Sequence, residues 1–370
     1  MPPRLAVTEA CGVEKKEIVA LFLKSGVLLR HEELERLAEL DDSEVREIAT
    51  APNPKNELTA RTARPRFEII KNLTSKPNSV TPALQSAFFN SRYEQMRAIA
   101  SQRIARNMLS INRLPGRGEV FLTGIIRDIR EGDKTVVELE DPTGSMAITF
   151  STKPDVRLDE FAAVRAVVAG QAAFGKEILY PDIPIRQATK GKGRGCFISD
   201  LHLEEAPQSD ARRLMSLVKS ENTDWLFVAG DTGNISLFEE MSGSAPTFIV
   251  PGEADTSDKY PQLPVKARRP NFVSLSNPTA VRIGGIVVLL CHQFELSMLR
   301  KRHLGPSEEV MERDFLVLDF VPDVVGYGHD HKPLVSNYKA TTLVNAGSLL
   351  TQATPVLVDF ESRSWKQLKL

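Results

Sequence analysis

The stretch GCFISDLH at residues 195–202 places an acid and a histidine directly after a run of apolar residues. The apolar run is typical of a buried strand, and Asp200 and His202 follow at its end. Residues two positions apart on an extended chain project to the same side. This spacing can therefore present one carboxylate oxygen and one imidazole nitrogen to a single metal ion.

Four further apolar stretches follow, and each ends in polar residues. They are Trp225–Asp231 with Gly-Asp, Phe248–Asp255 with Gly-Glu-Ala-Asp, Ile286–His292 with a lone His, and Val324–His331 with Gly-His-Asp-His. Five buried strands would thus deliver polar residues to one edge, which is the layout of a site at the carboxyl ends of strands. The chain has only six histidines. Four of them fall at these strand ends, whereas His31 and His303 lie in charged segments that are typical of the surface.

This ordered series resembles the motifs of the calcineurin-like metallophosphoesterase family, from Gly195 to the C-terminus. In that family two metal ions lie side by side in a four-layer αββα domain. The resemblance implies these ligands: for one ion Asp200, His202 and His331, for the other His292 and His329, and as a bridge between both Asp231. Mixed oxygen and nitrogen ligands suit Mn, Fe or Zn, with Mg a weaker match. Two divalent ions can clamp both oxygens of a phosphodiester and generate hydroxide near neutral pH.

The third motif departs from the family pattern. Where the family has Gly-Asn-His before an acid, this chain has Gly252-Glu253-Ala254-Asp255. Glu253 replaces the Asn ligand and can still coordinate through its carboxylate. Ala254 replaces a histidine that the family uses at the scissile phosphate, and loss of such a group typically costs a factor of ~10² to 10⁴ in rate. The candidate catalytic carboxylates are Asp231, Glu253 and Asp255, of which Asp255 is the nearest substitute for the missing imidazole.

Composition is that of a globular protein with an ample core. The chain has 370 residues, of which 42% are hydrophobic and 26% charged, and its formal net charge is −1. Any nucleic-acid affinity must therefore come from local basic patches. The cysteines Cys11, Cys196 and Cys291 are far apart, so we expect reduced thiols in a cytoplasmic protein. No run approaches the ~20 apolar residues of a membrane span.

The N-terminal part divides into three segments. Apolar periodicity predicts a small helical module over residues 1–50, either a self-contained bundle or a docking module. Prolines interrupt residues 51–80, so we expect a linker, in which residues 67–70 could form a short strand or a peptide-like segment. Residues 81–118 predict a basic helical connector that begins near Pro82.

Two basic segments are candidates for contact with DNA. Six arginines but only one acid occur between Arg92 and Arg117, which favours phosphate contact or salt bridges to an acidic neighbour about equally. Lysines and an arginine separated by glycines also precede the first strand of the metal site. The candidate DNA-binding residues are Arg103, Arg106, Lys190, Lys192 and Arg194.

Residues 119–190 change to the two-residue period of strands. Five short strands with a D-P-T-G turn at 141–144 predict an OB-fold barrel. Few aromatic residues are available for base stacking, so we expect a structural barrel packed on the next domain, with direct strand binding as the minor alternative. The phosphoesterase domain would then occupy residues 191–370. The expected fold class is α+β with several domains.

The order of helical module, linker, OB-fold and calcineurin-like domain is similar to the small (B) subunits of replicative DNA polymerases. Residues 260–264 (YPQLP) and 344–348 (VNAGS) also resemble that group. Because nearly all metal ligands are retained, the resemblance points to the archaeal D-family. It implies a 3′→5′ exonuclease on single-stranded DNA ends and a large catalytic polymerase subunit as partner. The sequence leaves open whether the chain contacts a sliding clamp.

Three functions are compatible with these features. The retained ligand set favours an active proofreading exonuclease, whereas Ala254 favours an inactive scaffold that holds the large subunit and accessory proteins. A free-standing phosphoesterase for small substrates ranks third, because it would not need the N-terminal half of the chain.

Overall fold

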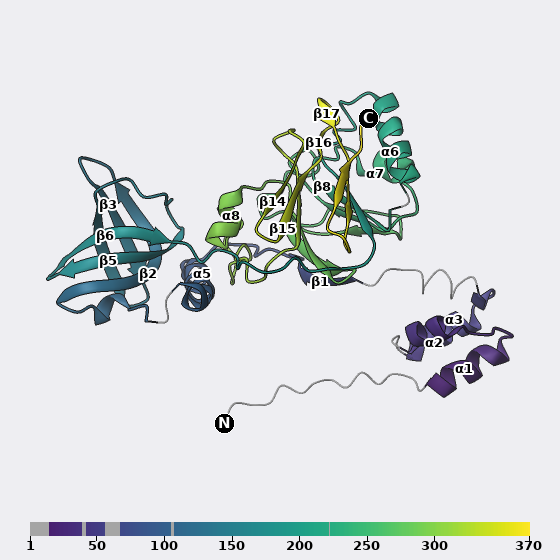
Figure 1. Ribbon diagram of the computed structural model, residues 1–370, viewed down its shortest axis with the longest axis horizontal. Coiled ribbons are helices and arrows are strands. Elements are labelled where there is room, and N and C mark those ends of the chain that lie inside the picture. The colour runs from purple at the N-terminus through teal and green to yellow at the C-terminus, as the bar shows by residue number, and fades with distance from the viewer. Residues whose placement is uncertain (1–14, 39–41, 56–66, 105–106, 222) are drawn as a thin grey trace. The chain divides into compact units, whose positions relative to one another are not determined.

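The computed structural model describes residues 15–38, 42–55, 67–104, 107–221 and 223–370 (Figure 1). The chain divides into two compact units, Met1–Arg66 and Phe67–Leu370. No helix in the described ranges combines the length and the apolar composition that a membrane crossing requires. The buried thiols of Cys196 and Cys291 are free, and Cys11 lies outside the described residues.

The first unit contains the helices α1 (Lys15–Lys24), α2 (His31–Leu37) and α3 (Asp42–Thr50). Their apolar residues recur at helical spacing, so each helix turns one face inward. The buried side chains that form this core are Ile18, Phe22, Val27, Leu37, Val45, Ile48 and Ala49. His31 is exposed, as expected. The described helices therefore share a core of their own, which the self-contained bundle requires.

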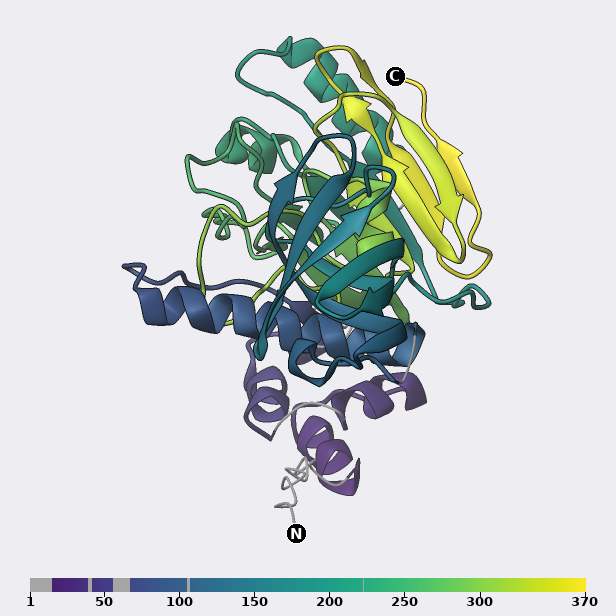
Figure 2. The ribbon, with the colours of Figure 1, turned by 90° about the vertical axis from the view of Figure 1, so that its left-hand side faces the viewer.

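The second unit opens with a strand and a long helix. The helix α5 (Pro82–Arg103) begins where the sequence predicts, because the Thr81 side chain accepts the N–H of Leu84 and Pro82 occupies the first turn. Figure 2 shows α5 from the side as the long blue helix. The buried face of α5 carries Phe88, Tyr93 and Met96.

A closed barrel follows, with the strand order β2-β3-β4-β6-β5. Its strands are β2 (Arg117–Arg130), β3 (Thr135–Asp141), β4 (Gly144–Phe150), β5 (Phe161–Ala169) and β6 (Ala172–Leu179), and a 3-10 turn, η1 (Ile111–Arg113), precedes them. Burial alternates strictly along β3, so every second side chain fills the interior. The predicted five-stranded barrel is confirmed.

The rest of the second unit is built on two six-stranded sheets. The first sheet has the order β1-β11-β12-β13-β15-β14 and the second the order β10-β9-β8-β7-β18-β19. The first comprises β1 (Phe67–Lys71), β11 (Thr279–Ile283), β12 (Ile286–Leu290), β13 (Val324–Tyr327), β14 (Leu334–Tyr338) and β15 (Thr341–Asn345). The second comprises β7 (Arg194–Ile198), β8 (Trp225–Ala229), β9 (Thr247–Val250), β10 (Phe272–Ser274), β18 (Val356–Asp359) and β19 (Trp365–Gln367). A short ribbon pairs β16 (Gly347–Ser348) with β17 (Gln352–Ala353).

The two sheets enclose an apolar core between their facing sides. The rings of Phe197 and Phe227 stack at 4.7 Å, and those of Phe227 and Phe248 at 5.3 Å. Helices α6 (Gln208–Ser220) and α7 (Ile235–Met241) pack on the outer side of the second sheet. The outer side of the first sheet is covered by α8 (Leu296–Lys301) and by loop residues up to 321, so this fourth layer is mostly loop. The αββα order is confirmed with few helices.

The segment Phe67–Lys71 corrects the linker that the sequence predicts over residues 51–80. This segment is the edge strand β1, which pairs antiparallel with β11. The next residues are also attached, because Asn72 Oδ1 accepts the N–H of Ser276 at 2.7 Å and Ser276 Oγ accepts the N–H of Leu73 at 2.8 Å. The short strand that the sequence allows at residues 67–70 is therefore present, whereas its partner β11, far along the chain, is not indicated by the local sequence.

Buried polar contacts tie α5 and the barrel to the loop that follows α8. Arg92 Nε donates to Asp314 Oδ2, and Arg92 Nη1 donates to the carbonyl of Asp159 in the barrel. His303 Nε2 lies 2.9 Å from the same Asp314 oxygen and is largely buried, so its expected surface position is wrong. Arg92, one of the six arginines between residues 92 and 117, therefore makes a structural salt bridge rather than a phosphate contact.

Candidate metal centre

The candidate ligands come together at one edge of the two sheets. Strands β7, β8 and β9 run parallel to one another, as do β12 and β13. Their carboxyl ends therefore face the same way, and the loops after them carry every metal-ligand candidate from the sequence. These residues are Asp200 and His202 after β7, Asp231 after β8, Glu253 after β9, His292 after β12, and His329 and His331 after β13.

The ligand atoms form three overlapping groups, each close enough to hold a metal ion. Within each group the atoms lie within 4.8 Å of one another. The groups are Asp200, His202 and His331; Glu253, His292 and His329; and Asp200, Asp231 and His292. The third group shares residues with the other two, so the two outer groups are neighbours.

Asp231 lies between the two outer groups. Its Oδ1 accepts the backbone N–H of Ala254 at 2.8 Å. Its Oδ2 lies 3.3 Å from His292 Nε2 and 3.8 Å from His202 Nε2. The backbone thus fixes one oxygen and turns the other toward a histidine of each group.

His292 is fully buried, and its tautomer is set by the backbone. Its Nδ1 lies 3.0 Å from the carbonyl of Ala229, to which it donates, so the lone pair is left on Nε2. This Nε2 is 2.8 Å from Glu253 Oε2, yet makes no hydrogen bond of acceptable geometry within the described part of the chain. A buried imidazole nitrogen of this kind, surrounded by carboxylates, suits a divalent cation.

Charge within the centre shifts its titrating groups. Burial lowers the pKa of His292, but the nearby carboxylates of Asp231 and Glu253 outweigh burial and raise the pKa to about 11 in the metal-free centre, so a bound cation would have to displace the proton from Nε2. For Asp231, burial raises the pKa, yet His292 outweighs this effect and the pKa falls to about 2. The carboxylate is therefore ionised at neutral pH, as a metal ligand must be.

The backbone of the centre is strained. Five candidate ligands have left-handed φ values, namely Asp200 (50°), His202 (43°), Asp231 (49°), His329 (73°) and His331 (57°). Such values are uncommon outside glycine, and each costs roughly 1–3 kcal/mol, so it persists only where the surrounding structure enforces it. Their concentration in one place indicates that the fold holds these side chains for a purpose other than stability.

Glycines of the motifs leave room for the ligands. A Cβ on Gly230 would collide with the His292 ring, and one on Gly252 or Gly328 would collide with the carboxylate of Asp231 or Asp200. The glycines in Gly-Asp, Gly-Glu and Gly-His are therefore required by close approach rather than by flexibility alone.

Both carboxylate oxygens of Asp255 accept backbone N–H groups. Its Oδ1 accepts the N–H of Gly233 at 2.9 Å, and its Oδ2 accepts those of Gly252 at 2.9 Å and Thr232 at 3.2 Å. Burial raises the pKa of Asp255, although these three N–H groups act against the shift. Both oxygens are thus engaged in holding the loop after β8, and the catalytic role of Asp255 stays a prediction.

The predicted basic residues do not surround the centre. Lys190, Lys192 and Arg194 precede or begin β7, whereas Asp200 follows its end. The N–H of Lys192 donates to the carbonyl of Gly284, at the start of β12. These residues therefore lie at the opposite edge of the sheets from the ligands. Arg103 is exposed and donates from Nε to the Asp182 carbonyl at 3.1 Å.

Arg106, the remaining predicted DNA-binding residue, lies outside the described residues. Within the described residues, the predicted DNA-binding residues therefore form no cluster beside the metal centre.

Three polar residues of the centre are missed by the sequence reasoning. Gln293 Nε2 donates to Glu253 Oε1 at 2.6 Å. Asn277 Oδ1 accepts the backbone N–H of His292 at 3.0 Å. Asn345 Nδ2 donates to Asp330 and to the Gly328 carbonyl, which fixes the loop of the last two histidines. Asn345 belongs to the VNAGS stretch, which the sequence analysis singles out without giving Asn345 a role. For Gln293 the available signal was its position directly after His292.

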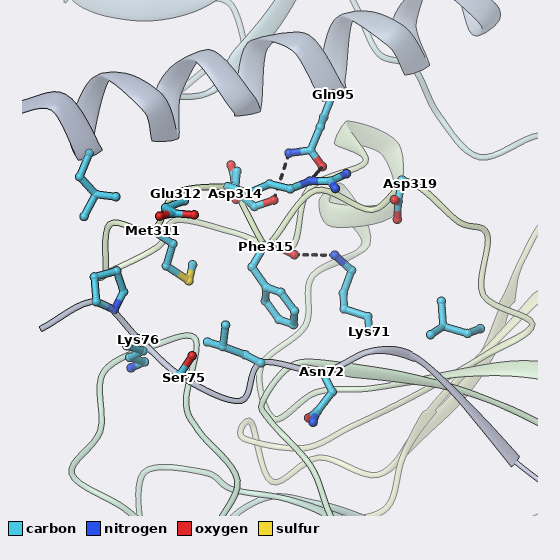
Figure 3. Close-up of a pocket in the computed structure, with 15 residues that line it drawn as sticks. Lys71, Asn72, Ser75, Lys76, Gln95, Met311, Glu312, Asp314, Phe315 and Asp319 are labelled. Carbon is cyan, nitrogen blue, oxygen red and sulfur yellow. Dashed lines mark hydrogen bonds between the residues drawn. The ribbon is translucent and has the colours of Figure 1, made fainter. Parts of the chain in front are cut away.

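A cavity of the second unit lies away from the candidate ligands. It has a volume of about 680 Å³ and is lined by residues 70–73 and 75–77, by Leu84 and Gln95 of α5, and by residues 311–315 and 319 of the loop after α8 (Figure 3). Lys71 Nζ donates there to the carbonyl of Phe315 at 2.6 Å, and burial lowers the pKa of Lys71. None of the candidate ligands lines this cavity.

Comparison with known proteins supports both resemblances. Residues 194–362 match the calcineurin-like phosphoesterase superfamily domain. The chain is 25% identical over 374 residues to the DNA polymerase II small subunit of Methanothermobacter thermautotrophicus, with 77% of each chain covered. It is 24% identical to that of Archaeoglobus fulgidus, over 77% of this chain and 74% of that protein. For Thermoplasma acidophilum the identity is 23%, over 92% and 87%.

These relatives confirm the predicted resemblance to small subunits of archaeal D-family DNA polymerases, and the domain match confirms the phosphoesterase fold.

Proposed function

We propose that this chain is the small subunit of a D-family DNA polymerase and that its metal centre is a 3′→5′ exonuclease for single-stranded DNA. The polymerase assignment rests on relatives that bear this name and span most of the chain. The observation that carries the nuclease is the pair of adjacent ligand groups with the Asp231 carboxylate between them.

The donor set fits two divalent cations. One would be held by Asp200, His202 and His331, the other by Glu253, His292 and His329, with Asp231 shared. Oxygen and nitrogen donors in this proportion favour Mn, Fe or Zn. Two ions so held supply a polarised phosphate and an activated water near neutral pH.

The residues of the chain supply the geometry for this chemistry. The N–H of His329 donates to both oxygens of Asp200, at 3.0 and 3.1 Å, and fixes that carboxylate from behind. The Ala229 carbonyl orients His292, and Ala254 holds Asp231 through its N–H. Such preorganisation keeps the ligands in place before substrate binds.

The missing imidazole limits the rate. Ala254 offers no side-chain donor, and both carboxylate oxygens of Asp255 are occupied by backbone N–H groups. We therefore expect weak exonuclease activity, lower than that of an otherwise identical site with the histidine by a factor of ~10² to 10⁴.

The experiment is a nuclease assay on the heterodimer with the large polymerase subunit. A 5′-labelled single strand is incubated with Mn²⁺, and wild type is compared with His292→Ala. Slow shortening from the 3′ end that disappears in the variant supports the proposal. Cleavage that persists in His292→Ala contradicts it.

A second candidate function is a scaffold without nuclease activity, which the alanine at position 254 favours. A heterodimer that polymerises DNA normally but shows no Mn²⁺-dependent shortening, even with Ala254→His, would establish the scaffold.

A further inference from the structure

Glu253 is the ligand candidate that differs most from the others in how it is held. The carboxylates of Asp200 and Asp231 each accept a backbone N–H, and His292 donates to a backbone carbonyl. Glu253, in contrast, follows β9 in a turn, and its side chain is 54% exposed. A long exposed carboxylate on three rotatable bonds has many conformations unless another group restricts it.

Gln293 supplies that restriction. Its Nε2 donates to Glu253 Oε1 at 2.6 Å. The other oxygen, Oε2, lies 2.8 Å from His292 Nε2 and 3.7 Å from His329 Nδ1. The amide therefore occupies one oxygen on the outer side and leaves the other directed at the two histidines.

The chemistry of the amide suits this position. Its nitrogen lies 3.4–3.5 Å from the ring nitrogens of His329, so it stands beside two ligand candidates at once. A lysine or arginine there would neutralise Glu253 and repel a cation, whereas a neutral amide donates without adding charge. Carboxylates that bind metals are commonly hydrogen-bonded in this way, and loss of such a partner typically weakens metal binding about 10–100-fold.

We infer that Gln293 is a positioning residue that holds Glu253 in the geometry needed to bind the second cation of the centre. The inference rests on the proposed two-metal site. Gln293 thereby makes the glutamate a usable replacement for the shorter asparagine of the family motif.

The test is calorimetric titration of the metal-free full chain with Mn²⁺. In wild type we expect two binding events. Gln293→Ala should weaken one of them by about 10–100-fold and leave the other unchanged. Gln187→Ala, the same change at an exposed glutamine outside the centre, serves as the matched control and should bind as wild type does.

A double-mutant cycle separates positioning from a general structural effect. In a Glu253→Asn background, Gln293→Ala should change Mn²⁺ affinity less than threefold, because the carboxylate that the amide holds is gone. Equal losses in both backgrounds, or wild-type affinity of Gln293→Ala, would overturn the inference. Two normal Mn²⁺ sites in a chain without nuclease activity would refute the proposed exonuclease and leave the role of Gln293 intact. Failure of wild type to bind Mn²⁺ would overturn both.

Discussion

The backbone N–H of Ala254 donates to Oδ1 of Asp231 over 2.8 Å. The residue that lacks the motif imidazole therefore still holds the carboxylate between the two ligand groups. A side chain can be restored at position 254 without disturbing this bond, because the bond uses only the backbone.

The first prediction concerns that position. Ala254→His should raise the exonuclease rate of the heterodimer about 10²- to 10⁴-fold, because it returns a donor to the leaving-group side. Adding Glu253→Asn should raise the rate further by restoring the family ligand. The rate of 3′ shortening of a labelled single strand is the measurement. Robust wild-type cleavage that Ala254→His does not improve would show that another group has taken over the role.

The second prediction concerns the shared carboxylate. Asp231→Asn replaces an anionic oxygen that faces both ligand groups. We expect wild type to hold about two Mn²⁺ ions per chain and the variant to bind Mn²⁺ more weakly at both positions, so that its metal content falls. Metal analysis after gel filtration measures this loss. Asp133→Asn, the same change in the exposed turn between β2 and β3, should leave the metal content unaltered. An unchanged metal content in Asp231→Asn would refute the two-metal centre.

The third prediction concerns truncation. Deletion of residues 1–66 should leave the heterodimer intact, because the second unit begins at Phe67. Deletion of residues 1–80 should lower the melting temperature, because it also removes β1 and the contacts of Asn72 with Ser276. Co-purification with the large subunit and thermal unfolding distinguish the two truncations. Loss of the complex on the shorter deletion would place the main interface in the N-terminal helices.

The fourth prediction concerns pH and the buried Asp314. Burial raises the pKa of its carboxyl, but His303 and Arg92 outweigh burial, so the pKa lies well below the ordinary value. A depressed pKa stabilises the folded state above the unfolded pKa of about 4, and this contribution is lost as the pH falls. Asp314→Asn should therefore cost about 3–5 kcal/mol at pH 7, because Arg92 is left buried and unpaired.

The difference between variant and wild type in Asp314→Asn should shrink as the pH falls from 5 toward 2, which urea unfolding at several pH values would reveal. Asp319→Asn, at an exposed position of the same loop, is the control. A pH-independent difference would mean that the Asp314 charge contributes nothing.

Local pattern located the candidate residues of the centre, and the family resemblance assigned their roles as ligands. Apolar runs that end in Asp or His place polar residues after parallel strands, so Asp200, Asp231 and His292 could be located from sequence. The glycines beside them are visible in the sequence, and they indicate that the backbone passes close to the ligand side chains there. The five barrel strands were also predictable, because their side chains alternate.

Contacts between distant segments were not predictable in the same way. Asp255 looked like a substitute catalyst because it follows the motif, but the direction of its carboxylate depends on the loop after β8. The positive charge of Lys192 and Arg194 says nothing about which end of the sheet they occupy. His303 is buried by a partner, Asp314, that the charged sequence around it does not indicate.

The pairing of β1 with β11 has a consequence for the order in which the second unit forms. Glu68 pairs with Arg282, which lies 214 positions later, and the whole barrel is encoded between them. On a ribosome, β1 emerges long before its partner β11. The barrel can therefore close before β1 and β11 have paired at the edge of the first sheet. We expect β1 to acquire protection from hydrogen exchange last during refolding, because the longest loop of the sheet must close around a finished barrel.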